Sequence, residues 1–252
     1  MKKWFRTTVE DILYSASLDL SFIPKVPDLY EKTYRCVRPY TMTSRRRIYE
    51  LLDAIQYISK SGLPGDFVEC GVWKGGSSLA AAMMLKSLGE TGRDLWLFDT
   101  YEGMVAPGDK DGSKANAGYK SSLRGGQGSD WCRSSLEEVK SHMFIADYPD
   151  DKIHYVAGAV EKTLPAQGPE KICLLRLDTD WYESTRHELE TLYPRLVPGG
   201  ILIIDDYGYW EGARRAVDEY FEDQNIHVYI KRIDETGVVI VKPRILDENS
   251  KS

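Results

Sequence analysis

The segment of residues 66–78, DFVECGVWKGGSS, constrains the fold more than any other part of the sequence. A short apolar run leads into a glycine-rich turn, and two serines then open a long segment of periodic apolar residues. This order predicts a strand, a tight turn and the N-terminus of a helix. Glycines in the turn let a ligand approach the backbone, and the free N–H groups of the first helical turn point toward it. The segment therefore predicts a ligand site, although similar turns occur in α/β folds that bind nothing.

Strands and helices alternate along most of the chain. Apolar runs predict strands at 67–70, 95–98, 153–156, 172–177 and 201–204, and apolar periodicity predicts helices at 44–61, 76–88, 135–144, 185–193 and 210–221. The runs 228–233 and 238–242 are joined around Gly237 and predict a hairpin. This alternation predicts an α/β fold with a mainly parallel sheet, a C-terminal antiparallel hairpin and helices on both faces. Residues 103–130 are rich in glycine, serine, aspartate and lysine, and they predict a long loop, a type that often forms a lid.

Composition narrows the classes of protein. A chain of 252 residues is long enough for one α/β domain. A net charge of −6 argues against a nucleic-acid or anionic-membrane partner, and no run is long enough to span a bilayer. The four cysteines are widely spaced and have the pattern of free thiols rather than of a zinc site or disulfide framework. The N-terminal MKKWF is followed by acidic residues that interrupt any signal-peptide core, so we expect a soluble cytoplasmic protein.

Acidic residues follow two of the predicted strands. Asp178 and Asp180 come after the strand at 172–177, and Asp205 and Asp206 come after the strand at 201–204. Because ligands bind where the strands of an open α/β sheet end, these acids should converge near the glycine turn. Several carboxylates at one point need a counter-charge, and a cation is the simplest source; all-oxygen ligands favour Mg²⁺ or Mn²⁺. The alternative is that Asp178 and Asp205 only cap the helices that follow them.

Five ordered motifs resemble the macrocin O-methyltransferase family: PYTMTS (39–44), GDFVECGVWKGGSS (65–78), LFDTYEGM (97–104), LRLDTDWYEST (175–185) and LVPGGILIIDDYG (196–208). The resemblance implies a class I methyltransferase fold, Rossmann-like with a seven-stranded sheet. It also implies S-adenosylmethionine as methyl donor, Mg²⁺ or Mn²⁺ bound by Asp178, Asp205 and Asp206, and a role in antibiotic biosynthesis. The acceptor would be a sugar or another small molecule with vicinal hydroxyls.

The same resemblance assigns the donor site. Glu69 and Gly71 would face the methionine moiety, and Asp99 would accept hydrogen bonds from the ribose hydroxyls, unless it is only a turn residue. Thr41, Met42 and Thr43 would close over the methionine carboxylate, with helix capping by Thr43 or Ser44 as the alternative. Gly71 and Gly75 should allow close approach of the ligand. The remaining predicted donor-site residues are Val72, Ser77, Ser78, Thr100, Tyr101, Gly158, Ala159, Val160 and Asp178, of which 158–160 would flank the adenine.

A base must take the proton from the acceptor hydroxyl, and Asp180 and Asp178 are the candidates within reach. Catechol O-methyltransferases, which have a similar arrangement, place a lysine three residues after the first metal aspartate. Here that position is Trp181, which makes a catechol-type mechanism doubtful. We expect aromatic residues to line the acceptor pocket, or else to pack at its rim: Tyr182, Tyr207, Tyr209 and Trp210. His187 is expected to be a solvated or capping residue.

The motifs divide the chain into an N-terminal extension at 1–60, a methyltransferase domain at 61–245 and a polar tail at 246–252. The extension would contribute to the donor and acceptor sites and would suit a homodimer or higher homo-oligomer. Two other classes remain open. A non-haem-iron hydroxylase needs two histidines and a carboxylate, and the four histidines form no H-x-D motif. A non-catalytic donor-binding protein would have no need of the metal aspartates.

Overall fold

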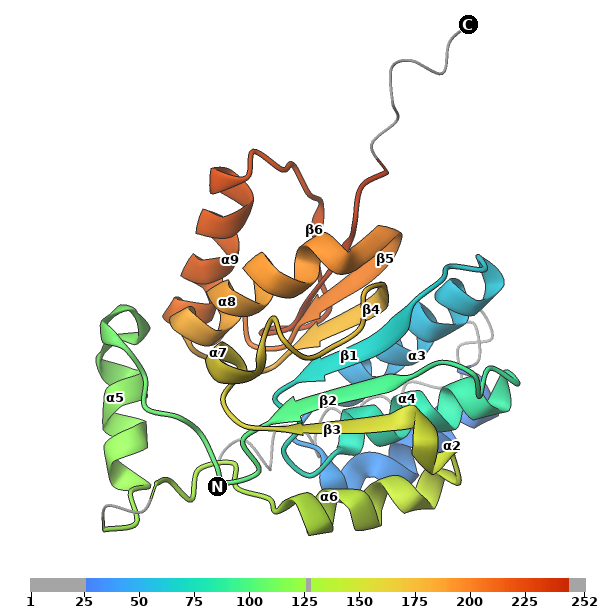
Figure 1. The fold of residues 1–252 in the computed structure, drawn as a ribbon, viewed down its shortest axis with the longest axis horizontal. Coiled ribbons are helices and arrows are strands. Elements are labelled where there is room, and N and C mark those ends of the chain that lie inside the picture. The colour runs from blue at the N-terminus through green and yellow to red at the C-terminus, as the bar shows by residue number, and fades with distance from the viewer. Residues whose placement is uncertain (1–25, 126–127, 245–252) are drawn as a thin grey trace, which may run out of the picture.

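The computed structural model describes residues 26–125 and 128–244, which form a seven-stranded sheet in the order β3-β2-β1-β4-β5-β7-β6 (Figure 1). Strands β1 to β5 run parallel, and β7 pairs antiparallel with β5 and with β6. The strands are β1 (Asp66–Cys70), β2 (Leu95–Asp99), β3 (Ile153–Ala157), β4 (Ile172–Leu177), β5 (Leu196–Ile204), β6 (Ile230–Arg232) and β7 (Val238–Val241). The predicted fold class, with its C-terminal hairpin, is confirmed.

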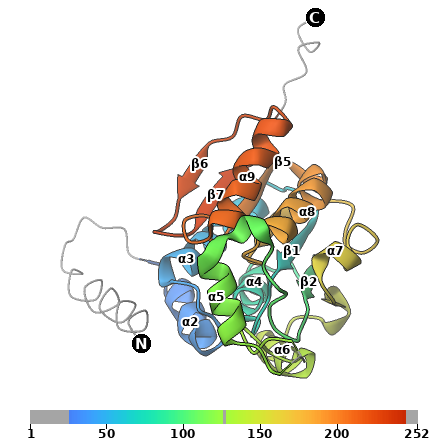
Figure 2. The same cartoon turned by 90° about the vertical axis from the view of Figure 1, so that its left-hand side faces the viewer.

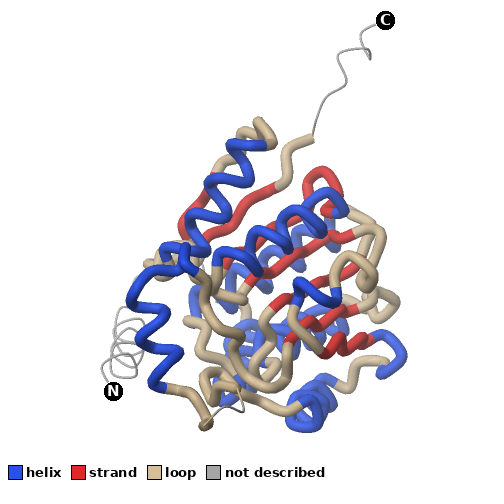
Figure 3. Tube along the Cα trace, turned by 60° about the vertical axis from the view of Figure 1, so that its left-hand side comes forward, coloured by secondary structure: helices blue, strands red, loops and turns tan. Residues whose placement is uncertain are grey.

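Helices cover both faces of the sheet (Figure 3). One face packs against α2 (Asp28–Val37), α3 (Arg45–Lys60), α4 (Gly76–Ser87) and α6 (Leu136–Met143). The other packs against α7 (Val160–Thr163), α8 (Tyr182–Leu192) and α9 (Glu211–Asp223). Neighbouring residues of one strand, such as Leu174 and Leu175, therefore belong to opposite hydrophobic clusters. Burial on both faces explains why the parallel strands are continuous apolar runs.

The two-residue period of the strands sets three charged side chains on one face. Glu69 pairs in register with Arg176, and Asp205 follows β5 on the face that Ile203 shares. All three are at the carboxyl ends of adjacent parallel strands, and all three are buried. Charged residues are rarely buried without a partner of opposite charge, so this edge of the sheet must contain a network of opposite charges.

The segment 103–130 is not the continuous loop that its composition predicts. It contains α5 (Gly112–Ser121), which stands beyond the carboxyl ends of the parallel strands (Figure 2). Only Ala115 of α5 is buried, so the helix has no apolar period that a sequence could show. Its start is fixed by Asp111, whose carboxylate accepts hydrogen bonds from the backbone N–H groups of Tyr182 and Gly108, both at 2.7 Å.

Several helix and strand boundaries in the structure also differ from the predicted ones. Strand β5 begins at Leu196 rather than at 201, because Pro198 to Gly200, which have the composition of a turn, continue the strand. Helix α8 begins at Tyr182 and β6 spans only three residues. Helix α2, which lies within the predicted N-terminal extension, is not among the helices that apolar periodicity predicts. Residues 1–25 of the predicted N-terminal extension and the predicted polar tail at 246–252 lie outside the described residues.

Within residues 26–125 and 128–244, no helix has both the length and the apolar character needed to cross a bilayer. The four cysteines are free thiols, as predicted.

Gly71 follows β1 with a φ of +82°, a conformation that favours glycine. A Cβ atom here would lie 2.1 Å from the carbonyl oxygen of Asp178. Besides its predicted place beside a ligand, this glycine therefore makes room for the backbone after β4. Gly75 likewise faces α6, where a Cβ atom would lie 3.2 Å from Cγ1 of Val139.

Replacing Gly71 by alanine should destabilise the fold. Gly71→Ala combines the left-handed backbone, about 1–2 kcal/mol, with a backbone clash that adds roughly 1–3 kcal/mol. The matched control is Gly89→Ala, because Gly89 has a φ of +76° but open space around it. Thermal unfolding should show a clearly larger loss for Gly71→Ala; equal losses in the two variants would contradict the steric explanation.

Candidate active site

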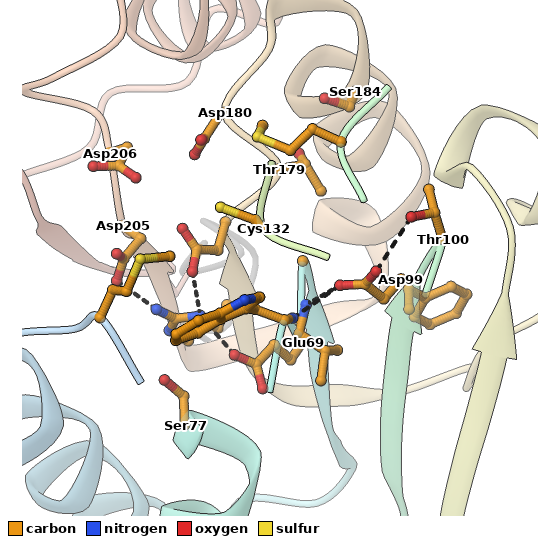
Figure 4. A pocket seen from close by; sticks show the side chains of 18 of the residues that line it. Glu69, Ser77, Asp99, Thr100, Cys132, Thr179, Asp180, Ser184, Asp205 and Asp206 are labelled. Carbon is orange, nitrogen blue, oxygen red and sulfur yellow. Dashed lines mark hydrogen bonds and ion pairs between the residues drawn. The ribbon is translucent and has the colours of Figure 1, made fainter. Parts of the chain in front are cut away.

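A cavity of about 300 Å³ opens at the carboxyl ends of the parallel strands (Figure 4). Figure 4 shows Asp205, Asp206 and Asp180 on one side of it and Asp99 with Thr100 on the other. Most of the predicted site residues line this cavity: Thr41, Met42, Glu69, Gly71, Val72, Ser77, Asp99, Thr100, Gly158, Ala159, Val160, Asp178, Asp180, Asp205 and Asp206. The sheet edge thus brings residues from 41 to 206 to one place.

Three predicted donor-site residues do not line the cavity. Gly75 faces α6. The hydroxyl of Ser78 hydrogen-bonds the carboxylate of Glu69, so Ser78 supports a cavity residue from behind. Tyr101 is buried in the core with its hydroxyl donating to the carbonyl oxygen of Leu97 at 3.0 Å.

Asp99 joins the end of β2 to the turn after β1. Its Oδ2 accepts hydrogen bonds from the backbone N–H groups of Val72 (2.7 Å) and Trp73 (2.9 Å). Its Oδ1 accepts from the backbone N–H of Tyr101 at 2.8 Å. The turn role that was the alternative for Asp99 is thus present. Burial raises the pKa of Asp99, and these three hydrogen bonds oppose the rise by stabilising the carboxylate.

Asp178, Asp205 and Asp206 can each place a ligand atom so that all three atoms lie within 4.8 Å of one another. Asp180 lies nearby with a φ of +72°, and its buried Oδ1 has no hydrogen-bond partner. Burial, and then the negative charge of Asp205, raises the pKa of Asp178. Burial, followed by the charges of Asp206 and Asp178, raises the pKa of Asp180. The acids therefore repel one another, as the sequence led us to expect.

Two arginines supply part of the counter-charge. Arg176 of β4 donates from Nη1 to Oε1 of Glu69 at 2.6 Å and to Oδ2 of Asp178 at 3.0 Å. Its Nη2 donates to Oδ1 of Asp205 at 2.5 Å and to the Thr43 hydroxyl at 3.1 Å. Arg47 of α3 binds the other oxygen of Asp205. A metal cation is thus not the only source of positive charge that can balance the acidic cluster.

Sequence reasoning missed both arginines. Arg176 had a signal, because a charged residue inside the apolar run ICLLRL must be paired once it is buried. Arg47 had none, since it stands in a run of three arginines at the start of a helix.

The charge balance still fits a divalent cation. The carboxyl groups lining the cavity outnumber its two guanidinium groups, and the lining residues include no lysine and no histidine among the described parts of the chain. The clustered donors are carboxylate oxygens, the ligands that Mg²⁺ and Mn²⁺ prefer. The unpartnered Oδ1 of Asp180 is a further buried acceptor beside them. A 2-His-1-carboxylate iron site is not formed by the lining residues.

An aromatic wall borders the acidic side of the cavity. Trp181 and Trp210 pack at a ring-centroid distance of 5.2 Å, and Trp131 packs against both. Trp131, Tyr209 and Trp210 line the cavity, together with Met104 and Val105. The expectation of an aromatic lining therefore applies to Tyr209 and Trp210. It does not apply to the other two tyrosines, whose hydroxyls donate to α9: Tyr182 to Glu219 and Tyr207 to Asp218.

Three further residues can be placed. Trp181, at the position of the catechol-type lysine, is buried and donates its indole N–H to the carbonyl oxygen of Val105 at 2.9 Å. His187 does not line the cavity, and its Nε2 lies 3.4 Å from the carbonyl oxygen of Leu164. Cys132, which no sequence pattern singles out, lines the cavity, and burial followed by the charge of Asp180 raises its pKa to about 12.

A sheet in this order, with a cavity at the carboxyl ends of its parallel strands, defines a class I methyltransferase. The chain belongs to the macrocin O-methyltransferase family, whose model matches residues 32–242. It is therefore an S-adenosylmethionine-dependent O-methyltransferase.

Three relatives illustrate the relationship. The chain is 36% identical over 199 residues to 8-demethyl-8-(2,3-dimethoxy-alpha-L-rhamnosyl)-tetracenomycin-C 4'-O-methyltransferase of Streptomyces olivaceus, covering 79% of this chain and 74% of the relative. It is 32% identical over 203 residues to mycinamicin III 3''-O-methyltransferase of Micromonospora griseorubida, covering 79% and 77%. The solved structure of the O-methyltransferase NovP superposes with a TM-score of 0.73 at 29% identity, covering 81% of this chain and 83% of that one.

A buried acid that is hydrogen-bonded to the cavity residue Thr179 predicts a pH effect on stability. Glu188 of α8 is fully buried, and its Oε2 accepts a hydrogen bond from the Thr179 hydroxyl at 3.1 Å. Burial raises the pKa of Glu188 well above its ordinary value. The stability that the protonated group contributes is thus complete below the unfolded-state pKa and is lost as the pH rises through the folded-state pKa.

Glu188→Gln should remove this loss, because the amide resembles the protonated acid and does not titrate. We expect the variant to lose less stability than the wild type as the pH rises above about 5, a range that begins just above the ordinary glutamate pKa of about 4.3. Urea unfolding at a series of pH values is the measurement. Parallel pH profiles of the two proteins would show that Glu188 does not titrate as its burial indicates.

Proposed function

We propose that this enzyme transfers the methyl group of S-adenosylmethionine to a hydroxyl of a sugar, or of another small molecule with vicinal hydroxyls, with the help of Mg²⁺ or Mn²⁺ bound by Asp178, Asp205 and Asp206. The observation that carries the proposal is that these three acids lie within 4.8 Å of one another in the same cavity as Glu69 and Asp99. One relative is named as the 4'-O-methyltransferase of a rhamnosyl tetracenomycin, and another as the 3''-O-methyltransferase of mycinamicin III. These names support a sugar acceptor and a role in natural-product biosynthesis.

The donor would occupy the side of the cavity formed by the turn after β1 and the end of β2. Asp99 presents a carboxylate that backbone N–H groups already hold in place, so it can accept hydrogen bonds from ribose hydroxyls. Glu69 is held by Arg176 and Ser78 and would face the methionine end. The small residues 158–160 line the cavity next to Asp99 and leave room for a flat adenine ring.

The acceptor would occupy the acidic side. A bound cation would lower the pKa of a coordinated hydroxyl and orient it for attack on the donor methyl group. The aromatic wall of Trp131, Tyr209 and Trp210 offers flat apolar faces to the C–H surface of a sugar. The residues of 103–105 and 131–132 close this side, so the segment that contains α5 would act as a lid.

Asp180 is the better candidate for the base. Asp178 already binds Arg176 through Oδ2, whereas Oδ1 of Asp180 is buried without a partner. The left-handed backbone of Asp180 is uncommon for a residue other than glycine, and such strain concentrates at functional sites. Asp180 would accept the hydroxyl proton as the methyl group is transferred, and its raised pKa would help it to keep that proton.

Removing the metal ligands should strongly reduce methyl transfer but leave donor binding largely intact, because Glu69, Gly71 and Asp99 would still hold the donor. Asp178→Ala and Asp206→Ala should each lower the rate by at least about 100-fold, since a metal ion contributes several kcal/mol to such a step. A chelator should have the same effect on the wild type. The measurement is transfer of labelled methyl from S-adenosylmethionine to rhamnosyl glycosides, with calorimetry of S-adenosylhomocysteine binding.

The control for these variants is Asp147→Ala, because Asp147 is exposed and pairs with Lys86 at the surface. It should be fully active. Full activity of the wild type in chelator, or of Asp178→Ala, would contradict the metal-dependent mechanism and leave a metal-free methyltransferase.

Asp180→Asn should separate the base from the ligands. The amide cannot take a proton, so the rate should fall by roughly 100- to 10,000-fold. Mn²⁺ binding should persist. In the wild type the rate should rise with pH as the base becomes deprotonated, and this rise should disappear or move in the variant. A variant with an unchanged pH–rate profile would assign the base to another residue.

A further inference from the structure

We propose that Arg47 and Asp234 form a positioning pair that fixes the carboxylate of Asp205 for metal binding. The proposal rests on the metal function proposed above for Asp205. Neither residue lies in β4 or β5, the strands that the acidic cluster follows. Arg47 lies in the first turn of α3, and Asp234 lies in the turn between β6 and β7. Their effect on the site is a property of how three distant segments meet.

Arg47 holds Asp205 at two points. Its Nη1 donates a hydrogen bond to Oδ2 of Asp205 and another to the backbone carbonyl oxygen of the same residue at 3.2 Å. The side chains of Arg47 and Asp205 are 13% and 6% exposed, so water screens this pair little. One guanidinium thus fixes both the backbone and the carboxylate of Asp205.

Arg176 binds the opposite oxygen of Asp205, so each carboxylate oxygen has its own arginine. The two guanidinium groups set the plane of the carboxylate and leave only its remaining lone pairs for a cation. Arg176 is anchored in a buried strand and is shared with Glu69 and Asp178. Arg47 is a long side chain from a helix, and its direction needs a support of its own.

Asp234 provides that support. Its Oδ2 lies 3.0 Å from Nε of Arg47 and accepts a hydrogen bond from the Ser44 hydroxyl at 2.6 Å. Its Oδ1 accepts from the backbone N–H groups of Thr236 (3.0 Å) and Gly237 (2.8 Å). Asp234 therefore cannot turn away without breaking its own turn.

The stem of Arg47 is also confined. A Cβ atom on Gly237 would lie 2.5 Å from Cδ of Arg47, so the turn packs directly against the arginine. The Ser44 hydroxyl, besides donating to Asp234, caps α3 by accepting from the backbone N–H of Arg47 at 3.3 Å. The helix start, the β6–β7 turn and the end of β5 thus form one connected network.

The network suits positioning better than stability. Replacing a buried ion pair by apolar residues is often neutral or stabilising, so such pairs are weak evidence for stability. This one ends on a carboxylate that lines the cavity, while Asp234 itself does not line it. Residues that orient metal ligands in this way tune metal affinity without touching the metal.

Asp234→Asn tests the pair with the smallest change. The amide oxygen can still accept from the N–H groups of Thr236 and Gly237, so the turn is retained. The amide nitrogen replaces the oxygen that faces Arg47 and Ser44, so the charge and the acceptor are lost there. Arg47→Lys is the second variant, because a lysine keeps the charge but cannot bridge Asp205 and Asp234 with a rigid fork.

The measurement is the affinity of the purified protein for Mn²⁺, obtained from the free-ion signal in electron paramagnetic resonance. We expect both variants to bind Mn²⁺ roughly 10- to 100-fold more weakly than the wild type. Binding of S-adenosylhomocysteine, measured by calorimetry, should be unchanged, and the double variant should be no weaker than the poorer single variant. Asp147→Asn, at an exposed residue paired with Lys86, is the matched control and should bind Mn²⁺ normally.

Each outcome decides the matter. Unchanged Mn²⁺ affinity in folded Asp234→Asn or Arg47→Lys would overturn the positioning role. A lower melting temperature with unchanged Mn²⁺ affinity would show that the pair is only structural. If the wild type binds no Mn²⁺, the metal part of the proposed function fails, and this inference fails with it. Failure of the positioning role alone would instead show a wild type that binds Mn²⁺ and variants that bind it equally well, so the two failures are distinguishable.

Discussion

The guanidinium of Arg176 is the interaction on which the site depends. It stands near the carboxyl end of a buried strand and touches side chains from β1, from the ends of β4 and β5, and from the segment before α3. Burying this charge costs desolvation free energy, and the attraction of the surrounding carboxylates offsets that cost. The dependence is mutual, because without Arg176 the buried carboxylates of Glu69 and Asp205 would lose a counter-charge that they share with Asp178.

This arrangement follows from elementary sheet geometry. Parallel strands end at one edge, and alternate residues share a face. Glu69 pairs in register with Arg176, and Asp205 lies two residues beyond Ile203, the partner of Arg176 on β5, so all three meet on one face. The same geometry divides the cavity into two sides. The turns after β1 and β2 form one side around Asp99, and the turns after β4 and β5 form the acidic side. Arg176 lies between them and contacts both through Glu69 and Asp178.

The remaining wall comes from segments with little regular structure. Residues 103–105 and 131–132 reach the cavity, and α5 between them is tied to the body of the enzyme through Asp111. Gly212 allows this contact, since a Cβ atom there would lie 1.8 Å from Oδ1 of Asp111. Lys114 of α5 lies over the ring of Tyr209, 3.6 Å from its centroid. Such a wall can differ between relatives while the sheet edge stays the same, which suits a family whose members act on different acceptors.

The sequence by itself determined the fold class, the order of the strands and of helices α3, α4, α6, α8 and α9, and the positions of the acids at strand ends. Apolar periodicity, glycine turns and charged residues at strand ends are local properties. It also contained the clue to Arg176, a charge inside an apolar run. Only the tertiary structure decided which groups balance the acids, why Gly71 is a glycine and how Arg47 and Asp234 reach Asp205. These depend on contacts between segments up to 190 residues apart, such as Ser44 with Asp234, and no local pattern records which distant side chains a folded chain brings together.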